Sequence, residues 1–274
     1  FLVTFVEREG RLGGTDMELA KKIVEAAGDA KVTIAGGVTT IEELVELDKI
    51  GADAQVGMAI YTGQMDLGEA IAAPLKSDRE DGLIPTVVTD ECGVALGLAY
   101  SSKESIKEAV RRQMGVYQSR KRGLWVKGES SGSTQDLLAI TPDCDKDTIR
   151  FTIHQHGPGF CHLPQFSCFG ETGGLTELER TLQKRRKEAP EGSYTKRLYD
   201  DPELLRSKLE EEARELSEAK TDEEVTWEAA DLIYFAMVKM AAQGVSLADV
   251  ERELDRRALK VKRRGGDAKP STKD

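Results

Sequence analysis

The hydrophobic pattern of this chain changes its character near Gly170–Gly174, and this change constrains the fold more than any other feature. Before this point, short apolar runs typical of strands alternate with amphipathic stretches typical of helices. From Thr176 onward the spacing of apolar residues is helical throughout. A chain of 274 residues is long enough for about two domains. We therefore expect a domain boundary at Gly170–Gly174.

The first 75 residues predict three strands separated by two helices. The strands are FLVTFVE, KVTIAGGV and AQVGMAI, and this order implies parallel strands covered by helices. Glycine-bearing turns, Gly36-Gly37 and Gly57-Met58-Ala59, stand at the C-terminal ends of the second and third strands. In (βα)8 barrels such turns bind phosphate through backbone N–H groups. The charged, turn-prone stretch 76–82 is expected to be a linker.

The next part, up to residue 156, is expected to be rich in strands. LIPTVVTD, GVALGLAY, DLLAITP and TIRFTIHQH have the pattern of strands, and a helix capped by Ser101 or Ser102 follows the second. Residues 115–135 form a basic segment rich in glycine and serine, with one tryptophan. Such a segment suits a phosphate-bearing ligand, and a charged hairpin without a ligand fits it equally well.

The last part predicts four helices, at 176–188, 202–220, 223–243 and 246–262. Thr176/Glu179 and Thr221/Glu224 have the spacing of capping boxes.

Composition indicates a globular protein and excludes some partners. Hydrophobic residues make up 39% of the chain and charged residues 32%, and no apolar run approaches the ~20 residues of a membrane span. A net charge of −10 argues against nonspecific nucleic-acid binding. We find no signal peptide, and we expect the four cysteines to be reduced thiols or metal ligands in the cytoplasm. Because Phe1 lies inside an expected strand, we expect the sequence to be a piece of a longer protein.

Soft and hard metal ligands lie side by side between residues 143 and 168. Thiolates suit zinc, whereas three carboxylates in a turn can surround a hard cation such as magnesium. The alternative is that the thiols are small core residues and the aspartates a solvated turn; for the whole set we favour metal. The cysteines are Cys144, Cys161 and Cys168, and the aspartates are Asp143, Asp145 and Asp147. Because Cys144 lies 17 residues before Cys161, the three thiols need not meet within one subunit.

A second group of acids lies on two of the expected helices. Glu211, Glu212 and Glu215 are on the helix at 202–220, and Glu228 and Asp231 are on the next one. From Val225 to Ala242 that second helix is otherwise apolar except for Lys239, and buried carboxylates are costly unless they are paired or bound to metal. Two antiparallel helices that each offer an acid pair predict a magnesium cage for a polyphosphate. A charged helix bundle without metal is the alternative.

The segment 83–170 resembles phosphoribosyl-AMP cyclohydrolase of histidine biosynthesis. The stretches that carry the resemblance are Leu98-Ala99-Tyr100, Ser119-Arg120, Leu124-Trp125, Lys127-Gly128-Glu129, Ser131-Gly132, Asp143–Asp147, Cys161-His162 and Ser167-Cys168-Phe169. One departure is Leu163–Phe166, LPQF where the family usually has T-G-R-R. Because two basic residues that could hold a phosphate are absent there, we expect Arg120, Arg122 or Lys127 to take this role, or the substrate to bind more weakly.

The resemblance implies zinc on Cys144, Cys161 and Cys168, with Cys144 donated by the other subunit of a homodimer. It also implies magnesium on Asp143, Asp145 and Asp147, and attack of zinc-activated water on C6 of an adenine ring, after which the N1–C6 bond opens. His162, as general acid/base, and Lys127 are the catalytic residues that it implies. The implied substrate-binding residues are Ser119, Arg120, Trp125, Lys127, Gly128, Ser131 and Gly132.

The segment 175–264 resembles the phosphoribosyl-ATP pyrophosphohydrolases, all-α enzymes related to MazG. The resemblance rests on the acid pattern, on SYTKRL, EAADLIY and GVSLADVERELDRR, and on Lys208 as an implied phosphate contact. Glu210 stands where the family commonly has glycine. Residues 1–75 resemble a degenerate half of a ProFAR isomerase barrel, in which Phe5 replaces the catalytic aspartate. We therefore expect a structural or vestigial role for this segment.

The order of the three segments resembles fungal multifunctional histidine-biosynthesis proteins. It implies a fold with a partial (βα)-barrel-like segment at 1–75, a strand-rich α+β cyclohydrolase domain at 83–170 and an all-α helical domain at 175–264. Residues 265–274 are then a linker into a histidinol dehydrogenase domain. Two alternatives remain open, namely a general nucleotide pyrophosphohydrolase joined to a zinc hydrolase and a non-catalytic scaffold stabilised by metal.

Overall fold

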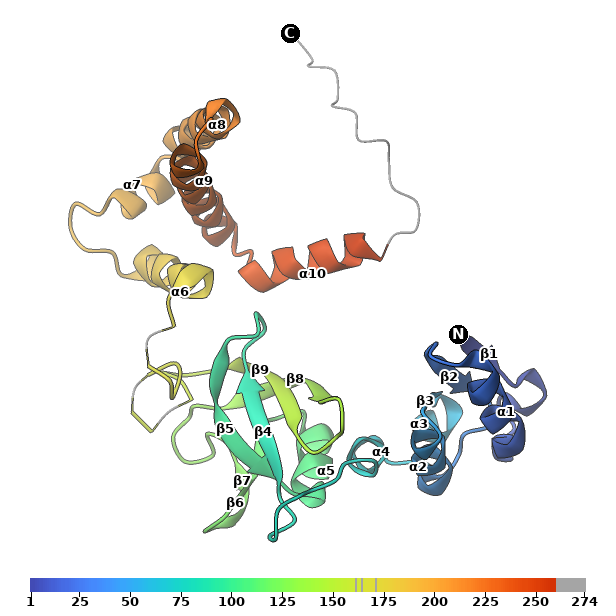
Figure 1. Ribbon diagram of the computed structural model, residues 1–274. Helices are drawn as coiled ribbons and strands as arrows, with labels where there is room; N and C mark the ends of the chain where they lie inside the picture. Colours follow the sequence, from blue (N-terminus) through green and yellow to red (C-terminus); the bar gives the residue numbers. More distant parts are fainter. Residues whose placement is uncertain (161, 164, 171, 260–274) are drawn as a thin grey trace. The chain divides into compact units, whose positions relative to one another are not determined.

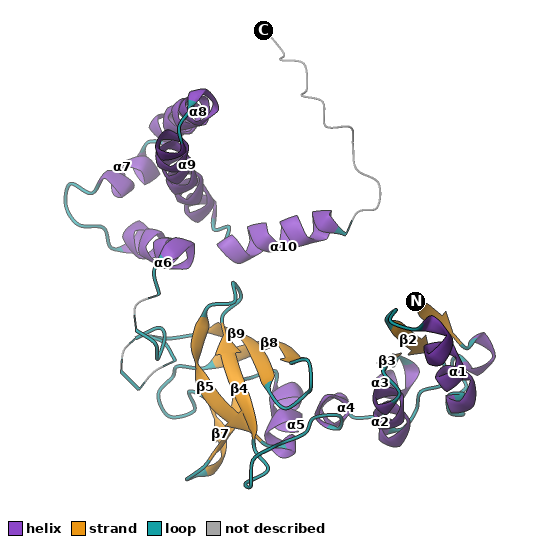
Figure 2. Ribbon diagram, in the orientation of Figure 1, coloured by secondary structure: helices purple, strands orange, loops and turns teal. Residues whose placement is uncertain are grey.

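The computed structural model describes residues 1–160, 162–163, 165–170 and 172–259 (Figure 1). It divides into two compact units, Phe1–Glu171 and Thr172–Asp274. The first unit contains all the strands of the described residues, and the described part of the second unit is helical (Figure 2). Within the described residues, no helix is long and apolar enough to cross a membrane.

The N-terminal part of the first unit is a three-stranded parallel sheet in the order β1-β2-β3. Its core is formed by Ile34 and Leu47 among others, and the α2 capping box at Thr40 and Glu43 orients the chain after β2. The expected first strand is shorter than its apolar run, because Val6–Arg8 turn into a 3₁₀ helix. The elements are β1 (Leu2–Thr4), α1 (Met17–Ala27), β2 (Val32–Ala35), α2 (Ile41–Lys49), β3 (Ala52–Gln55), α3 (Met58–Tyr61) and α4 (Leu67–Ala72).

A four-stranded mixed sheet in the order β5-β4-β9-β8 forms the rest of the first unit. The central strand β4 pairs antiparallel with β5 and parallel with β9, and α5 and the β6–β7 hairpin contribute to the same core. Ser102, one of the two expected caps, caps α5. The elements are β4 (Ile84–Thr89), β5 (Ala95–Ser101), α5 (Lys103–Arg112), β6 (Val116–Ser119), β7 (Gly123–Val126), β8 (Gln135–Pro142) and β9 (Ile149–Gln155).

The core around this sheet extends back across the expected break at residues 76–82. Ala72 and Leu75 are buried in it together with Phe151. The Lys76 N–H donates to the Lys146 carbonyl at 2.9 Å, which fastens the start of the break to the β8–β9 turn. An expected linker is therefore packed at its N-terminal end.

The described helices of the second unit surround a core that includes Leu182, Leu198, Leu205 and Val238. The elements are α6 (Gly174–Lys187), α7 (Tyr194–Asp200), α8 (Pro202–Glu218), α9 (Asp222–Gln243) and α10 (Leu247–Ala258). Sequence analysis missed α7, a short helix capped by Ser193.

The two expected capping boxes have different outcomes. Thr221 and Glu224 form one at the start of α9, as predicted. The prediction for Thr176 was wrong, because α6 already begins at Gly174. Glu179 instead accepts a hydrogen bond at 2.6 Å from the backbone N–H of Leu247, the first residue of α10. The acid thus caps another helix instead of its own.

A buried polar chain crosses the sheet core. The hydroxyl of Tyr117 donates to Oε1 of Gln135 at 2.7 Å, and Nε2 of Gln135 donates to Oε1 of Gln155 at 2.7 Å. Tyr117 and Gln135 are fully buried, and the Tyr117 ring packs against Phe151 and Trp125. An unpaired polar atom at this depth costs more than a hydrogen bond contributes.

We expect Tyr117→Phe to lower the free energy of unfolding of the first unit by about 1–3 kcal/mol, because it leaves Oε1 of Gln135 without its donor. Urea denaturation would be followed by fluorescence in a Trp227→Phe background, in which Trp125 is the remaining tryptophan. Tyr100→Phe is the control, and it should change the free energy by less than about 0.5 kcal/mol. Equal effects of the two substitutions would contradict the role of the buried chain.

Candidate active sites

Acids from α8 and α9 converge between two helices that pack side by side (Figure 1). Ligand oxygens of Glu212, Glu228 and Asp231 all lie within 4.8 Å of one another, and so do those of Glu211, Glu212 and Glu215. Glu212 belongs to both groups and is only 4% exposed. The structure therefore brings together all five acids expected to form the magnesium cage.

Helix geometry and capping explain this convergence. The acid pairs at 212/215 and 228/231 are each three residues apart, so each projects from one face of its helix. Asp201 caps α8 with Pro202 in its first turn, and the capping box at Thr221 and Glu224 fixes the start of α9. These caps set the register in which the two acidic faces meet.

The charges in this cage are unbalanced. Nζ of Lys208 lies 2.8 Å from Oε2 of Glu211 and 2.9 Å from Oε1 of Glu212, and these hydrogen bonds raise the pKa of Lys208. Desolvation and the charges of Glu215, Glu212 and Asp231 raise the pKa of Glu228 above the usual value of a glutamate. Among the described residues, the one cation that is ion-paired with cage acids is Lys208, and it contacts only Glu211 and Glu212.

A second candidate site is a cleft of about 580 Å³ beside the β6–β7 hairpin. It is lined by Arg122, Trp125, Lys127, Gly128, Ser130, Ser131, Ser133, Pro158, Phe160, His162, Leu163 and Cys168. Cations, hydroxyls and aromatic rings together suit a phosphorylated aromatic ligand.

Lys127 lies in the wall of this cleft and is only 5% exposed. Its Nζ donates to the Ser133 carbonyl at 3.4 Å and lies 5.3 Å from the centre of the Phe160 ring. Gly128, which follows it, has φ +82°, and a Cβ there would lie 2.3 Å from the backbone carbon of Ser133. At Gly128 and Ser133 the two sides of this loop therefore pass so close to each other that only glycine, which has no side chain, fits at position 128.

His162 and Cys168 line the same cleft as Lys127. The backbone N–H of Cys168 donates to the Leu96 carbonyl at 2.8 Å, which fixes the thiol beside the start of β5. Cys161, the expected zinc ligand next to His162, lies outside the described residues. The other two histidines do not line the cleft: His154 contacts Glu91, and Nε2 of His156 lies 2.8 Å from Oδ2 of Asp136.

Cys144 lies far from this cleft. It is exposed in the turn between β8 and β9, and β9 begins at Ile149, opposite Thr86 near the start of β4. The Cys168 N–H donates to the carbonyl of Leu96, and the preceding residue, Ala95, pairs with Thr89 at the other end of β4. A six-residue strand is about 20 Å long, whereas two sulfurs bound to one zinc lie within about 5 Å of each other. The structure therefore does not bring Cys144 and Cys168 together within one chain.

The three aspartates expected to bind magnesium do converge, in the same turn as Cys144. Ligand oxygens of Asp143, Asp145 and Asp147 lie within 4.8 Å of one another. Desolvation acts to raise the pKa of Asp143, but backbone N–H groups of Thr148 and Lys146 outweigh it and lower the pKa. Lys146 adopts a left-handed conformation with φ +68°, which closes the turn, and its ammonium group contacts Asp48.

The remaining residues expected to bind substrate divide into two groups. Trp125, Lys127, Gly128 and Ser131 line the cleft. Ser119, Arg120 and Gly132 do not, since they build the turns beside it. The Ser119 hydroxyl accepts from the N–H groups of Lys121 and Arg122, the Arg120 guanidinium lies 4.9 Å from the Tyr100 ring centre, and the Gly132 N–H donates to the Gly128 carbonyl.

Sequence analysis did not single out Ser133 and Phe160 as residues of this cleft. Phe160 packs on Gly97 of β5, where a Cβ would lie 2.3 Å from the ring. The pairing of a glycine with a distant aromatic residue leaves no local signal in the sequence, whereas the Ser130–Ser133 run was visible as part of the glycine- and serine-rich segment.

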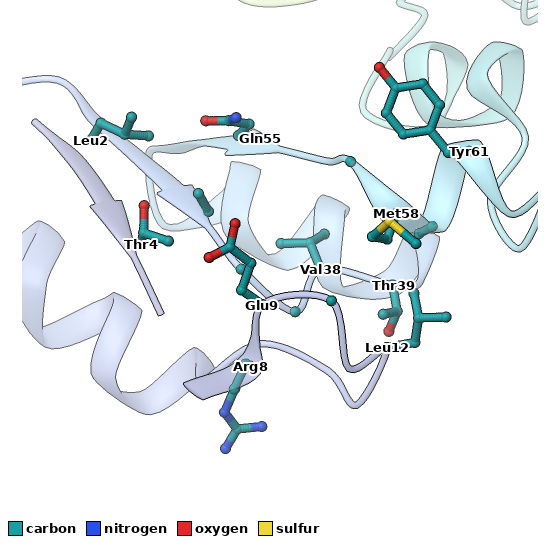
Figure 3. Close-up of a pocket in the computed structure, with 16 residues that line it drawn as sticks. Leu2, Thr4, Arg8, Glu9, Leu12, Val38, Thr39, Gln55, Met58 and Tyr61 are labelled. Atoms are coloured by element: carbon teal, nitrogen blue, oxygen red, sulfur yellow. The ribbon is translucent and has the colours of Figure 1, made fainter. Parts of the chain in front are cut away.

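A third cavity, of about 300 Å³, lies at the carboxyl ends of β1, β2 and β3 (Figure 3). The glycine-bearing turns at Gly36-Gly37 and Gly57 line it. The cation that lines it, Arg8, donates to the Gly14 carbonyl at 3.0 Å and points away from Thr4 and Gln55, whereas Glu9 reaches toward them. A carboxylate in this position disfavours a phosphate.

Family models match three parts of the chain. Residues 97–170 match phosphoribosyl-AMP cyclohydrolase, residues 175–258 match phosphoribosyl-ATP pyrophosphohydrolase, and residues 1–66 match the model described as histidine biosynthesis protein. The two hydrolase matches contain the cleft and the acid cage, respectively.

Curated relatives combine these parts. The histidine biosynthesis trifunctional protein of Komagataella pastoris is 50% identical over 242 residues, which are 88% of this chain and 28% of that protein. The histidine biosynthesis bifunctional protein of Schizosaccharomyces pombe is 55% identical over 206 residues, 75% of this chain and 49% of that protein. The chain thus spans half or less of these fungal relatives.

The bifunctional protein HisIE of Bacillus subtilis is shorter, and the match is 37% identical over 199 residues, 67% of this chain and 95% of that protein. The chain therefore belongs to the family of histidine biosynthesis bifunctional proteins, in which a phosphoribosyl-AMP cyclohydrolase domain is followed by a phosphoribosyl-ATP pyrophosphohydrolase domain.

Proposed function

We propose that this chain catalyses two successive hydrolyses of histidine biosynthesis. The helical unit releases pyrophosphate from phosphoribosyl-ATP, and the strand-rich domain then opens the adenine ring of the resulting phosphoribosyl-AMP. The observation that carries the proposal is the acid cage, in which a nearly buried Glu212 is shared by two carboxylate groups in the segment that matches the pyrophosphohydrolase family.

The acid cage fits magnesium. Hard oxygen donors from two helices are what this ion prefers. Desolvation and the neighbouring carboxylates raise the pKa of Glu228, which is consistent with a site that a cation would stabilise. Glu211, Glu212, Glu215, Glu228 and Asp231 are the residues that would hold it. Magnesium supplies charge neutralisation at a polyphosphate and activation of water. Lys208 adds a cation of the chain itself, which is hydrogen-bonded to Glu211 and lies 2.9 Å from Glu212.

The cleft fits the second reaction. Trp125 and Phe160 offer ring faces to a base, while Arg122 and Lys127 offer cations to a phosphate. His162 lines the same cleft and acts as the general acid/base that moves a proton to the ring as it opens. A zinc held by thiolates supplies a nucleophile at neutral pH.

The zinc ligands require two copies of the chain. Cys168 lines the cleft of one copy. The family resemblance assigns Cys161 to the same centre, and we assign the third thiolate to Cys144 of a second copy, because Cys144 lies at the far end of its own sheet. Asp143, Asp145 and Asp147 then bring a magnesium site to the edge of the shared centre. The enzyme is accordingly a homodimer in this proposal.

The N-terminal segment has no part in this chemistry. Phe5 stands where the isomerases have an acid, and the carboxylate of Glu9 lines the cavity at the carboxyl ends of the strands. We infer that the segment is a barrel-like remnant with a structural role. We also place the enzyme in the cytoplasm, with a histidinol dehydrogenase domain in the longer protein, as the resemblance to fungal multifunctional proteins implies.

We expect Glu212→Gln to reduce pyrophosphate release from phosphoribosyl-ATP by about a hundredfold or more, since it removes a charge shared by both acid groups. Glu210→Gln, on the exposed face of the same helix, is the matched control and should retain activity. Faster hydrolysis of ordinary nucleoside triphosphates than of phosphoribosyl-ATP would favour a general nucleotide pyrophosphohydrolase instead. Unchanged activity of the Glu212→Gln variant would contradict the catalytic role of the acid cage and favour the alternative of a non-catalytic scaffold.

We expect Cys144→Ser and Cys168→Ser each to abolish ring opening, and a mixture of the two variants to recover it. In a mixed dimer one site receives Cys144 from one copy and Cys168 from the other, so equal mixing restores about a quarter of the sites. Zinc content should recover in the same proportion. A mixture that stays inactive, although both variants fold and exchange subunits, would contradict the shared site.

We expect Glu228→Gln to stabilise the metal-free protein at pH 7.5 and to have little effect near pH 4. A carboxyl group whose pKa is raised by folding destabilises the fold once it ionises. The free energy of unfolding therefore falls as the pH rises from the ordinary pKa of a glutamate through the raised pKa of Glu228. Thermal unfolding would measure this. Magnesium should raise the melting temperature of the wild-type chain more than that of the variant, and an equal rise would argue against Glu228 as a ligand.

A further inference from the structure

The chain has two tryptophans, and the proposed chemistry uses only Trp125. Trp227 lies on α9, directly before Glu228 of the acid cage, and is 70% exposed. Further along the same helix, Phe235 is buried. An indole exposes a large apolar area to water, and its flat face is well suited to stack on another ring.

A depression of about 620 Å³ opens beside this indole, and its volume is in the range of small-ligand sites. It is lined by Asp222, Glu223, Thr226, Trp227, Ala230 and Asp231. Asp231 belongs to both the depression and the acid cage. Trp227 precedes Asp231 by four residues, about one helical turn of 5.4 Å, so both project from the same side of α9. The depression is therefore continuous with the cage.

The charges around the depression favour a base over a phosphate. Asp222 and Glu223 repel anions, so the polyphosphate belongs among the cage acids and their cations, and not here. An adenine that is substituted at N1, as in phosphoribosyl-ATP, is a stronger base than adenine itself and carries a positive charge near neutral pH. A cationic ring is attracted both to an indole face and to carboxylates beside it.

We propose that Trp227 is a substrate-binding residue whose indole stacks on the adenine ring of the nucleotide, while the acid cage holds its phosphates. This inference rests on the proposed pyrophosphohydrolase function and names the part of the site that recognises the base. The stacking holds the ring about one helical turn from Asp231 of the cage, and Asp222 and Glu223 favour the N1-substituted ring over that of ATP.

The test is steady-state kinetics of pyrophosphate release from phosphoribosyl-ATP by the 274-residue chain and its Trp227→Ala variant. Removal of one stacking interaction should raise KM about tenfold and leave kcat within about twofold. Inorganic tripolyphosphate, which has no base, should inhibit both proteins with the same constant. Trp227→Phe should restore most of the affinity, because its ring still stacks. The ratio of kcat/KM for phosphoribosyl-ATP over ATP should fall in Trp227→Ala.

Val225→Ala is the matched control, since Val225 is also exposed on α9 but does not line the depression. It should leave KM unchanged. An unchanged KM in Trp227→Ala would overturn the inference, and so would an equal loss of affinity for phosphoribosyl-ATP and tripolyphosphate. If Trp227→Ala alters the sedimentation coefficient relative to the wild type but leaves KM unchanged, the indole belongs to an interface between copies of the chain. That result would also overturn the proposed stacking. A wild-type chain that releases no pyrophosphate from phosphoribosyl-ATP would instead refute the proposed function.

Discussion

The pairing of β4 with its two neighbours determines where the chemistry of the first unit can lie. Because β5 runs antiparallel and β9 parallel to β4, the β8–β9 turn lies at the start of β4 and the segment containing Cys168 lies at its end. Reversing either pairing alone would place both at the same end of β4. The sheet therefore separates the acidic turn from the cleft by the length of a strand, and buried residues such as Ile149, Phe151 and Ile153 hold β9 in this register.

The helical unit depends on the opposite arrangement, in which like charges are brought together. Folding places Glu228 among other acids and raises its pKa, and Lys208 offsets only part of the repulsion. The apolar core around Leu205, Phe235 and Val238 stabilises the helix pair against this repulsion. A site that is destabilised in this way is pre-organised for cations, because binding a divalent ion relieves strain that the fold already contains.

Features with a local cause could be predicted from the sequence. The alternating patterns predicted most strands, the Thr221/Glu224 spacing predicted a capping box, and the acid spacing on two helices predicted the cage. The features that were missed depend on contacts between distant residues. Glu179 caps α10 instead of α6, Phe160 reaches the cleft because Gly97 leaves room for its ring, and Ala72 and Leu75 join a core beyond the expected break. Nothing near these residues in the sequence indicates such partners.

The two proposed centres differ in how they depend on protein concentration. All five acids of the cage come from α8 and α9 of a single chain, so the proposed release of pyrophosphate would need the metal ligands of one chain alone. The proposed thiolate centre, with Cys144 at the far end of the sheet, exists only where two chains meet. In this proposal, dilution would leave the first reaction intact and remove the second, so that phosphoribosyl-AMP would accumulate. The abundance of the protein would then set not only the rate of the two proposed reactions but also their ratio.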